Sequence, residues 1–290
     1  MNIRRILTPV PVLVLGIVLT VPGPAAADSG KVERTEQIRK SIEFGSPAGR
    51  ELVVDNVFGS ISITGTSGSR IELTARKTIR ARNRDKLARA ADEVTLDITR
   101  DGNAIELYVD GPFRWEDEHG RHIRWRNPGY TVTFDFEIEV PRETDIYLKT
   151  VNKGDITVKG VDGDFNVRNV NGSITIDGIG GSGRAHTVNG PVRVTFSRHP
   201  GEDCSFKTVN GDLDIAFPGG LSADFQLKTF HGDMYTDFAV DYLPQPTAEP
   251  ARKNGKYVYR GHRFVGVRAG RGGPRIRMDT LNGDILIKKR

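Results

Sequence analysis

The chain has 290 residues, a formal net charge of +5 at pH 7 and a single cysteine, Cys204. This length is enough to bury a large core in one or two domains. The charge is mild and spread along the chain, so it does not indicate specific binding to nucleic acid. One cysteine excludes an intrachain disulfide, so packing and hydrogen bonds must hold the fold together.

Residues 1–27 have the order of a secretory signal peptide. Arg4 and Arg5 precede an apolar run over residues 6–21, and three alanines at 25–27 offer a cleavage site. A permanent membrane anchor is the alternative, but the prolines and the short apolar run argue against a spanning helix. We therefore expect an exported protein, periplasmic or at the cell surface, with no transmembrane segment after cleavage.

The next part of the chain is predicted to contain a leader, several strands and one helix. Residues 28–50 are polar and are predicted to form a flexible leader, with one edge strand near residues 38–44. Alternating apolar residues predict strands through much of residues 51–141. Residues 83–93 carry the one helical pattern, with Asn83 or Asp85 available as its N-cap. Its shared face comprises Leu87, Ala90 and Ala91.

Two segments interrupt the strand pattern and are predicted to be excursions from the core. Residues 111–129 hold both tryptophans, Trp115 and Trp125, among many charged residues. Exposed tryptophans often anchor interfaces or stack on sugars, whereas buried ones would cap the core, and both alternatives stay open here. The second segment, residues 243–256, is rich in proline and basic residues.

A Thr-x-Asn-Gly motif recurs in the second half of the chain and is followed each time by alternating apolar residues. Its glycines at 154, 172, 190, 211 and 232 are 18 to 21 residues apart. Such a period is typical of stacked repeats, and Asn-Gly pairs favour turns because both residues tolerate positive φ. The predicted structural turn residues are Asn171, Gly172, Asn189, Gly190, Asn210, Gly211, Asn282 and Gly283.

The repeat predicts an all-β fold, in which residues 51–290 form one β-repeat domain with a repeat core at 142–290. We favour a β-solenoid, or β-helix, in which like residues stack in register about 4.8 Å apart. Thr and Asn ladders would then satisfy backbone groups at the corners. An antiparallel β-sandwich is the alternative, because Asn-Gly also favours two-residue hairpins.

Three features between Tyr130 and Lys288 form a recognisable pattern. They are Phe136-Glu137-Ile138-Glu139-Val140-Pro141, Leu148-Lys149-Thr150-Val151-Asn152 and the repeated Thr-x-Asn-Gly-Asp-Ile. On these residues, the stretch resembles the bacterial putative-adhesin family, an exported domain of unknown function. The resemblance implies a β-helical body at the cell envelope. The Trp-rich and proline-rich segments depart from the simple pattern.

The sequence offers no convincing catalytic, metal or cofactor site. The acidic residues after the motif glycines recur at a turn, which indicates a structural role in accepting backbone hydrogen bonds rather than a catalytic pair. These residues are Asp155, Asp212, Asp233 and Asp284. His119 and His122 with nearby glutamates form the one zinc-like cluster, which is better explained as a solvated loop. We therefore predict neither an enzyme nor a cofactor.

Alignment of the repeats reveals a basic column four residues before the motif glycine. In-register stacking would place its members in a stripe about 20 Å long. The stripe comprises Lys149, Arg168, His186, Lys207 and Lys228. A solvated face is the alternative to a ligand-binding surface.

These patterns together predict a non-enzymatic envelope protein, an adhesin or a ligand-binding scaffold. Its partners would be an anionic envelope polymer, a glycan or an envelope protein. A polysaccharide-active β-helix enzyme and a structural or envelope-stress component that binds membrane proteins are the alternative functions.

Overall fold

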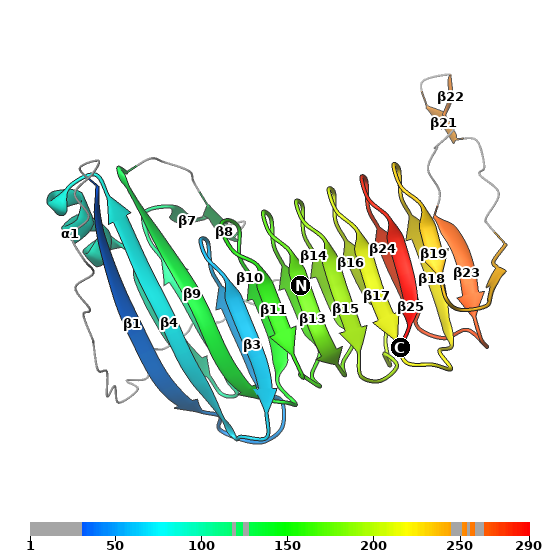
Figure 1. The fold of residues 1–290 in the computed structure, drawn as a ribbon, viewed down its shortest axis with the longest axis horizontal. Helices are drawn as coiled ribbons and strands as arrows, with labels where there is room; N and C mark the ends of the chain where they lie inside the picture. Colours follow the sequence, from blue (N-terminus) through cyan, green and yellow to red (C-terminus); the bar gives the residue numbers. More distant parts are fainter. Residues whose placement is uncertain (1–30, 118–119, 124–127, 245–250, 254–255, 259–263) are drawn as a thin grey trace. The chain divides into compact units, whose positions relative to one another are not determined.

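The computed structural model describes residues 31–117, 120–123, 128–244, 251–253, 256–258 and 264–290. These residues are all-β apart from one short helix, as predicted, and most strands belong to two large mixed sheets (Figure 1). The chain divides into two compact units, an N-terminal unit (Met1–Val161) and a C-terminal unit (Asp162–Arg290). The expected signal peptide, residues 1–27, lies outside the described residues.

In the N-terminal unit, the first sheet changes from antiparallel to parallel pairing. β1 pairs antiparallel with β4, and β4 with β9, whereas β9, β3 and β11 run parallel. In spatial order the strands are β1 (Val32–Glu43), β4 (Arg70–Ala81), β9 (Tyr130–Pro141), β3 (Ile61–Thr66) and β11 (Ile156–Lys159). β1 is an edge strand, as expected near residues 38–44, but it begins at Val32, and every one of its residues has a partner in β4. The flexible leader predicted for residues 28–50 is therefore corrected for residues 32–43.

The second sheet of this unit contains shorter strands. β10, β2 and β6 pair parallel, and β5 pairs antiparallel with β6. Its strands in spatial order are β10 (Asp145–Lys149), β2 (Glu51–Asp55), β6 (Ala104–Asp110) and β5 (Thr95–Asp101). Alternate residues are buried in both sheets, as the apolar alternation predicts.

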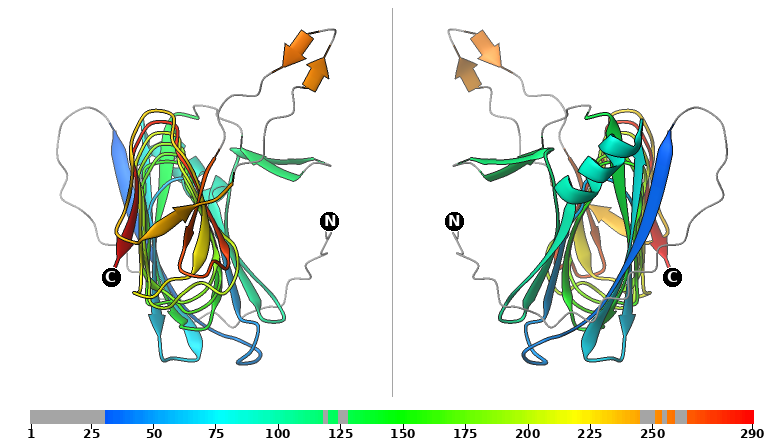
Figure 2. Two further views of the ribbon diagram at one scale, coloured as in Figure 1. Left: turned by 90° about the vertical axis from the view of Figure 1, so that its right-hand side faces the viewer. Right: turned by 90° about the vertical axis from the view of Figure 1, so that its left-hand side faces the viewer.

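The single helix of the described residues, α1 (Arg84–Glu93), packs against β4, β9 and β1 (Figure 2). Asn83 caps it by accepting a hydrogen bond from the backbone N–H of Lys86, which confirms the predicted cap. Near its end, Lys77 of β4 is almost completely buried and donates to the Ala91 carbonyl at 2.9 Å. This contact satisfies a carbonyl that the last turn of a helix leaves without a partner.

In the C-terminal unit the chain passes back and forth between two sheets with parallel repeat strands. One sheet contains β13 (Ile174–Ile179), β15 (Val192–Phe196), β17 (Leu213–Phe217), β25 (Ile285–Lys289) and β19 (Met234–Thr236). The other contains β12 (Phe165–Arg168), β14 (Gly183–His186), β16 (Cys204–Lys207), β24 (Arg275–Asp279), β18 (Ala223–Lys228), β23 (Val265–Ala269) and β20 (Val240–Tyr242). In this second sheet only the pairings with β23 are antiparallel.

The sandwich-like alternative fits these two layers, although the repeat strands are parallel rather than antiparallel. The stacking order also departs from the chain order. β24 lies between β16 and β18, and β25 lies between β17 and β19 (Figure 1). The last repeat is therefore inserted between two earlier ones, because the chain leaves the stack after β19 and returns through β23.

Two hairpins lie within the predicted excursions. β7 (Arg114–Asp117) pairs with β8 (Gly120–Ile123) within residues 111–129. β21 (Ala251–Lys253) pairs with β22 (Lys256–Val258) within and just beyond residues 243–256. No helix of the described residues has the length and apolar character needed to cross a bilayer.

The corner between the two sheets of the C-terminal unit is a ladder of like residues. The side chains of Asn171, Asn189, Asn210 and Asn282 form consecutive amide hydrogen bonds of 2.7 Å, and His231 continues the series at 2.9 Å. The motif threonines beside them donate to the glycine carbonyls of the neighbouring repeat at 2.9 to 3.0 Å. These bonds fix the register of the outward-facing residues on either side.

The motif glycines make this stacking sterically feasible. Gly190, Gly211 and Gly283 have φ between 147° and 152°. A Cβ on Gly211 would lie 2.3 Å from the Gly190 carbonyl oxygen. Only glycine, which has no Cβ, can adopt this positive φ so close to the neighbouring carbonyl oxygen. The core of the unit is aliphatic and aromatic, and at the far ends of β15 and β17 the Phe196 and Phe217 rings stack at 4.8 Å between centroids.

Candidate functional site

The strands β12, β14, β16, β24 and β18 align their outward-facing residues in two columns, because the parallel pairs are in register. One column consists of Arg168, His186, Lys207, Asp279 and Lys228. The column two residues earlier consists of Asn166, Arg184, Ser205, Arg277 and Gln226. The structure thus groups positive side chains on this face, and ligand binding by them remains a prediction.

The composition of the predicted stripe needs correction. Asp279 lies between Lys207 and Lys228, because β24 is inserted between β16 and β18. The repeat with its glycine at 283 places this aspartate at the position that holds a basic residue in its neighbours. The stripe in the C-terminal unit therefore carries a carboxylate among its cations rather than an unbroken basic series.

A shallow hollow of about 400 Å³ lies on this face, entirely within the C-terminal unit. Four basic side chains and two carboxylates line it, together with neutral groups. Its lining consists of Arg184, His186, Asp203, Cys204, Ser205, Lys207, Gln226, Arg275, Arg277 and Asp279. Arg168 and Lys228 occupy the columns at its two sides but do not line it.

Arg277 is held in the hollow by an aromatic contact. Its guanidinium carbon lies 4.2 Å from the centroid of the Phe264 ring, and Lys228 approaches the same ring at 5.7 Å. A carboxylate oxygen of Asp279 lies 4.0 Å from the Arg277 guanidinium. Stacking on an aromatic face orients a guanidinium while leaving its N–H groups free to meet an anion.

The remaining charged groups leave an excess of positive charge. Asp203 accepts a hydrogen bond of 2.7 Å from the backbone N–H of Arg275. Among the described residues, neither Arg184 nor Lys207 forms an ion pair or a side-chain hydrogen bond. These two cations therefore line the hollow without an ion pair, although Asp279 lies beside Lys207 in the neighbouring strand.

His186 contributes a neutral imidazole rather than the positive charge that the stripe prediction assumed. Burial lowers its pKa to about 4, and the neighbouring cations Arg168, Lys207, Arg184 and Arg277 add to the effect. The Nε2 atom lies 3.1 Å from the Ser205 hydroxyl. At neutral pH this pair supplies uncharged hydrogen-bonding groups in the floor of the hollow.

Cys204 is not suited to act as a nucleophile in this hollow. Its side chain is buried, and burial raises the pKa of its thiol to about 11. A thiol with such a pKa is almost entirely protonated at neutral pH, and the thiolate is the reactive form.

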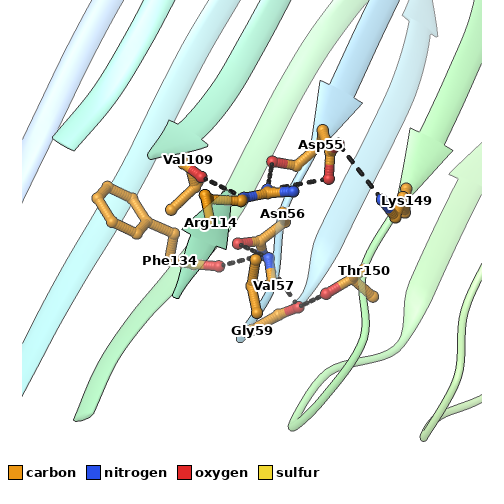
Figure 3. A network of polar contacts seen from close by, with 9 residues as sticks. All are labelled: Asp55, Asn56, Val57, Gly59, Val109, Arg114, Phe134, Lys149 and Thr150. Atoms are coloured by element: carbon orange, nitrogen blue, oxygen red, sulfur yellow. Dashed lines mark hydrogen bonds and ion pairs between the residues drawn. The ribbon is translucent and has the colours of Figure 1, made fainter. Parts of the chain in front are cut away.

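Lys149, the first residue of the predicted stripe, belongs to the N-terminal unit and has a partner there. Its ammonium lies 3.4 Å from the Asp55 carboxylate (Figure 3). Arg114 approaches the same carboxylate at 3.0 Å and also donates to the Asp55 and Val109 carbonyls. The Arg114 side chain is only 4% exposed. This network joins the base of the β7–β8 excursion to the body of the unit.

The two tryptophans are placed to different extents. Trp115 in β7 is 40% exposed, next to the buried Arg114. Trp125 lies outside the described residues, as do the side chains of His119 and His122. Both functions suggested for the tryptophans remain predictions. No group of three or more His, Cys, Asp or Glu suited to a metal occurs among the described residues.

A larger cleft of about 670 Å³ lies in the N-terminal unit beside α1. Its lining includes Phe58, Phe113, Val132 and Tyr130, and two of its charged residues pair with each other. Glu93 accepts a hydrogen bond of 2.6 Å from the Tyr130 hydroxyl and pairs with Arg89. These contacts lower the pKa of Glu93, the Tyr130 bond first and the Arg89 bond second. The cleft is mainly apolar and lacks the cluster of unpaired cations seen in the hollow.

The acidic column after the motif glycines has the backbone contacts that the sequence indicated. The Asp212 carboxylate accepts from the Asp284 N–H at 2.9 Å, and Asp284 in turn accepts from the Asp233 N–H at 2.8 Å. These carboxylates thus link neighbouring repeats.

Sequence reasoning missed Arg184, Arg275 and Arg277, the arginines that make the hollow basic. A signal was present, because Arg275 and Arg277 alternate with buried residues in one strand and must share its outward face. Their position beside Lys207 was not readable, since it depends on the insertion of β24.

No protein-family model matches this chain, and no curated protein matches it. Among solved structures, it is similar to a putative cell adhesion protein from Clostridium sporogenes, with 9% identity and a TM-score of 0.42 over 88% of this chain and 100% of that one. A putative adhesin from Bacteroides fragilis has 11% identity and a TM-score of 0.35 over 88% and 97% of the two chains. A putative lipid binding protein from Parabacteroides distasonis has 9% identity and a TM-score of 0.29 over 88% and 96%. Likeness at this level leaves the function to be argued from the residues themselves.

Proposed function

We propose that this protein is a non-enzymatic scaffold of the cell envelope that binds phosphate-bearing envelope components at the basic hollow of its C-terminal unit. The observation that carries the proposal is the grouping of Arg184, Lys207, Arg275 and Arg277 around one hollow that contains two carboxylates. Guanidinium groups bind phosphate oxygens through paired N–H donors, so several of them around one hollow favour a phosphate-rich ligand.

The neutral floor of the hollow supports the same ligand chemistry. Ser205 and His186 add hydrogen-bonding groups without negative charge. The cost of keeping several like charges close together falls when an anion binds between them. Binding would therefore relieve repulsion as well as add contacts.

The scaffold itself is proposed to be a β-solenoid in its repeat region. The support for this assignment is the parallel in-register stacking and the continuous Asn ladder of the C-terminal unit. A stack of this kind holds its outward side chains at fixed spacing, which suits it to a repetitive or extended ligand.

Export and an adhesin-like role complete the proposal. Export is supported by the order of charge, apolar run and small residues in residues 1–27. The adhesin-like role is supported by the resemblance carried by residues 136–141 and 148–152 with the repeated motif.

The experiment is a calorimetric titration of the purified full chain with inorganic polyphosphate at low ionic strength. We expect the triple variant Lys207→Gln, Arg275→Gln and Arg277→Gln to bind at least tenfold more weakly than the original chain. Added salt should weaken binding by the original chain, because the hollow is open to solvent.

The matched control is Arg193→Gln with Lys288→Gln and Lys289→Gln, which removes three exposed cations from the other sheet of the same unit. This control is expected to bind polyphosphate within twofold of the original chain. Equal losses in the control and the triple variant would reduce the effect to net charge and reject the hollow as the site. Absence of binding by the original chain would reject the proposed function.

A further inference from the structure

A column of apolar side chains runs along the corner of the C-terminal unit, next to the basic hollow. Its members occupy the variable position of the Thr-x-Asn-Gly motif and its close copies. In spatial order they are Val170, Val188, Val209, Leu281 and Phe230. The carbonyl of each residue except the last, Phe230, accepts a hydrogen bond of 2.8 Å. The donor is the backbone N–H of the motif Asn or His in a neighbouring repeat.

Several of these side chains are unusually open to solvent for large apolar residues. The exposed fractions are 38% for Val188, 45% for Leu281 and 49% for Phe230. The Asn ladder and the Thr bonds hold the corner in register, so these side chains have no freedom to withdraw into the core. Val170 and Val209 are half-buried in the same column. Three exposed apolar side chains held in one column on a fixed frame are typical of a contact surface rather than of scattered surface residues.

The apolar column lies beside the charged columns in a definite order. Each of its residues follows a member of the stripe by two positions, as Val209 follows Lys207 and Phe230 follows Lys228. The uncharged Asn ladder comes immediately after it. The surface thus presents, side by side, a basic hollow, an apolar column about 20 Å long and a neutral amide ladder.

We propose that this surface docks on an anionic phospholipid membrane, with Phe230 and Leu281 in the interfacial region and headgroup phosphates in the hollow. The inference rests on the proposed function, because it identifies the source of the phosphate. Charge complementarity favours an anionic lipid surface, and the apolar column distinguishes such a surface from a soluble polyanion, which offers nothing apolar to contact. Peripheral membrane binding combines buried apolar area with attraction of basic groups to anionic lipid in this way.

The arrangement also explains why the two features are useful together. A few exposed apolar side chains give only marginal membrane affinity, and a few cations near an anionic surface add only a modest attraction. Neither alone holds a protein firmly. Because the ladder fixes the backbone of the corner, both features can engage one surface without ordering the backbone first.

The test is co-sedimentation of the full chain with vesicles of phosphatidylcholine containing phosphatidylglycerol, and with vesicles of phosphatidylcholine alone. Polyphosphate titration of the same variants reports on the hollow independently. All variants carry residues 1–27, so the apolar run in that segment contributes equally to every measurement. Urea unfolding of each variant shows whether it is folded.

We expect the double variant Phe230→Ser with Leu281→Ser to bind phosphatidylglycerol vesicles at least tenfold more weakly while its polyphosphate affinity stays within twofold. Arg275→Gln with Arg277→Gln should weaken both interactions at least tenfold. The matched control is Tyr235→Ser, because Tyr235 is 54% exposed on the other sheet of the same unit. It should leave vesicle binding unchanged.

A second measurement avoids any loss of apolar packing. In Phe230→Trp, the added indole emission is expected to shift to shorter wavelength on phosphatidylglycerol vesicles, relative to the original chain, and not on phosphatidylcholine vesicles. Unchanged vesicle binding by the serine double variant, or no shift of this emission, would overturn the docking proposal. Retained polyphosphate binding would then leave the proposed function intact. If the original chain binds neither vesicles nor polyphosphate, both the docking proposal and the proposed function are rejected.

Discussion

The Asp55 network of the N-terminal unit and the basic hollow of the C-terminal unit use charged side chains in different ways. In the N-terminal unit, Arg114 and Lys149 share the Asp55 carboxylate, and Arg89 pairs with Glu93. In the hollow of the C-terminal unit, Arg184 and Lys207 form no ion pair among the described residues. The difference teaches that a count of basic residues says little about binding, because internal pairing decides which charges remain available to a ligand.

The units also differ in what fixes their strands. In the N-terminal unit, the long strands β1, β4 and β9 pair antiparallel, and α1 packs against them. The C-terminal unit depends on corner contacts that recur from repeat to repeat, namely Thr, Asn and Gly in fixed positions. Substitutions in these two kinds of structure therefore make the comparison testable.

The largest effect is expected from Gly211→Ala. Its φ of 152° and the 2.3 Å approach of an added Cβ to the Gly190 oxygen combine backbone strain with a steric clash. We expect the free energy of unfolding to fall by about 4 kcal/mol. Urea denaturation measures it, and Gly201→Ala is the control because nothing lies within 4 Å of its added Cβ. Equal effects of the two substitutions would show that the stacked corner does not need glycine.

The second prediction compares a paired cation with an unpaired one. Arg114→Gln should lower the free energy of unfolding by about 3 kcal/mol, since it breaks a buried pair and leaves Asp55 with Lys149 alone. Lys207→Gln should change it by less than about 0.5 kcal/mol, because no internal contact is lost. Urea denaturation of both variants checks this difference. A larger effect of Lys207→Gln would contradict the contrast between the units.

The third prediction concerns His186, whose pKa is lowered to about 4 by burial and by neighbouring cations. The unfolded chain, with an ordinary His pKa of about 6.5, takes up the proton first, so stability falls as the pH drops from about 6.5 towards 4. The difference between these two pKa values corresponds to about 3 kcal/mol at pH 4, and solvent screening at this partly exposed side chain reduces the expected share to about 2 kcal/mol. Unfolding free energies at pH 7 and pH 4 should show a smaller acid loss in His186→Gln than in the original chain.

A titration of His186 by NMR extends this prediction to the ligand. Polyphosphate in the hollow would offset the repulsion from the surrounding cations and raise the His186 pKa. An unchanged pKa at saturating polyphosphate would place the anion elsewhere.

The smallest effect is expected from Asn210→Ala, which removes an amide from the middle of the ladder. Two side-chain hydrogen bonds of 2.7 Å are lost at an exposed position, which should lower the free energy of unfolding by about 1 kcal/mol. Asn166→Ala, in the outward column of the same unit, is a control outside the ladder. If the two variants lose the same stability, the ladder does not contribute beyond an ordinary surface amide.

Much of the local structure could be predicted from the sequence. The strand alternation, the Asn83 cap of α1 and the hydrogen bonds of the aspartates after the motif glycines all follow from contacts that repeat at short or regular intervals. Long-range pairing was harder to predict. The pairing of β1 with β4 and the partners of Lys149 join residues far apart in the chain, so no local pattern reveals them.

The sequence by itself determined which residues face outward and which turn the corner, because side-chain alternation and glycine backbone geometry are local properties. Only the tertiary structure decided which outward residues become neighbours. The chain returns after β23 and inserts β24 between β16 and β18, which brings Arg275 and Arg277 beside Lys207 and places Asp279 within the stripe. Burial among those neighbours then keeps His186 neutral at pH 7. The free energy of a charged imidazole depends on its surroundings, and only the folded chain brings these surroundings together.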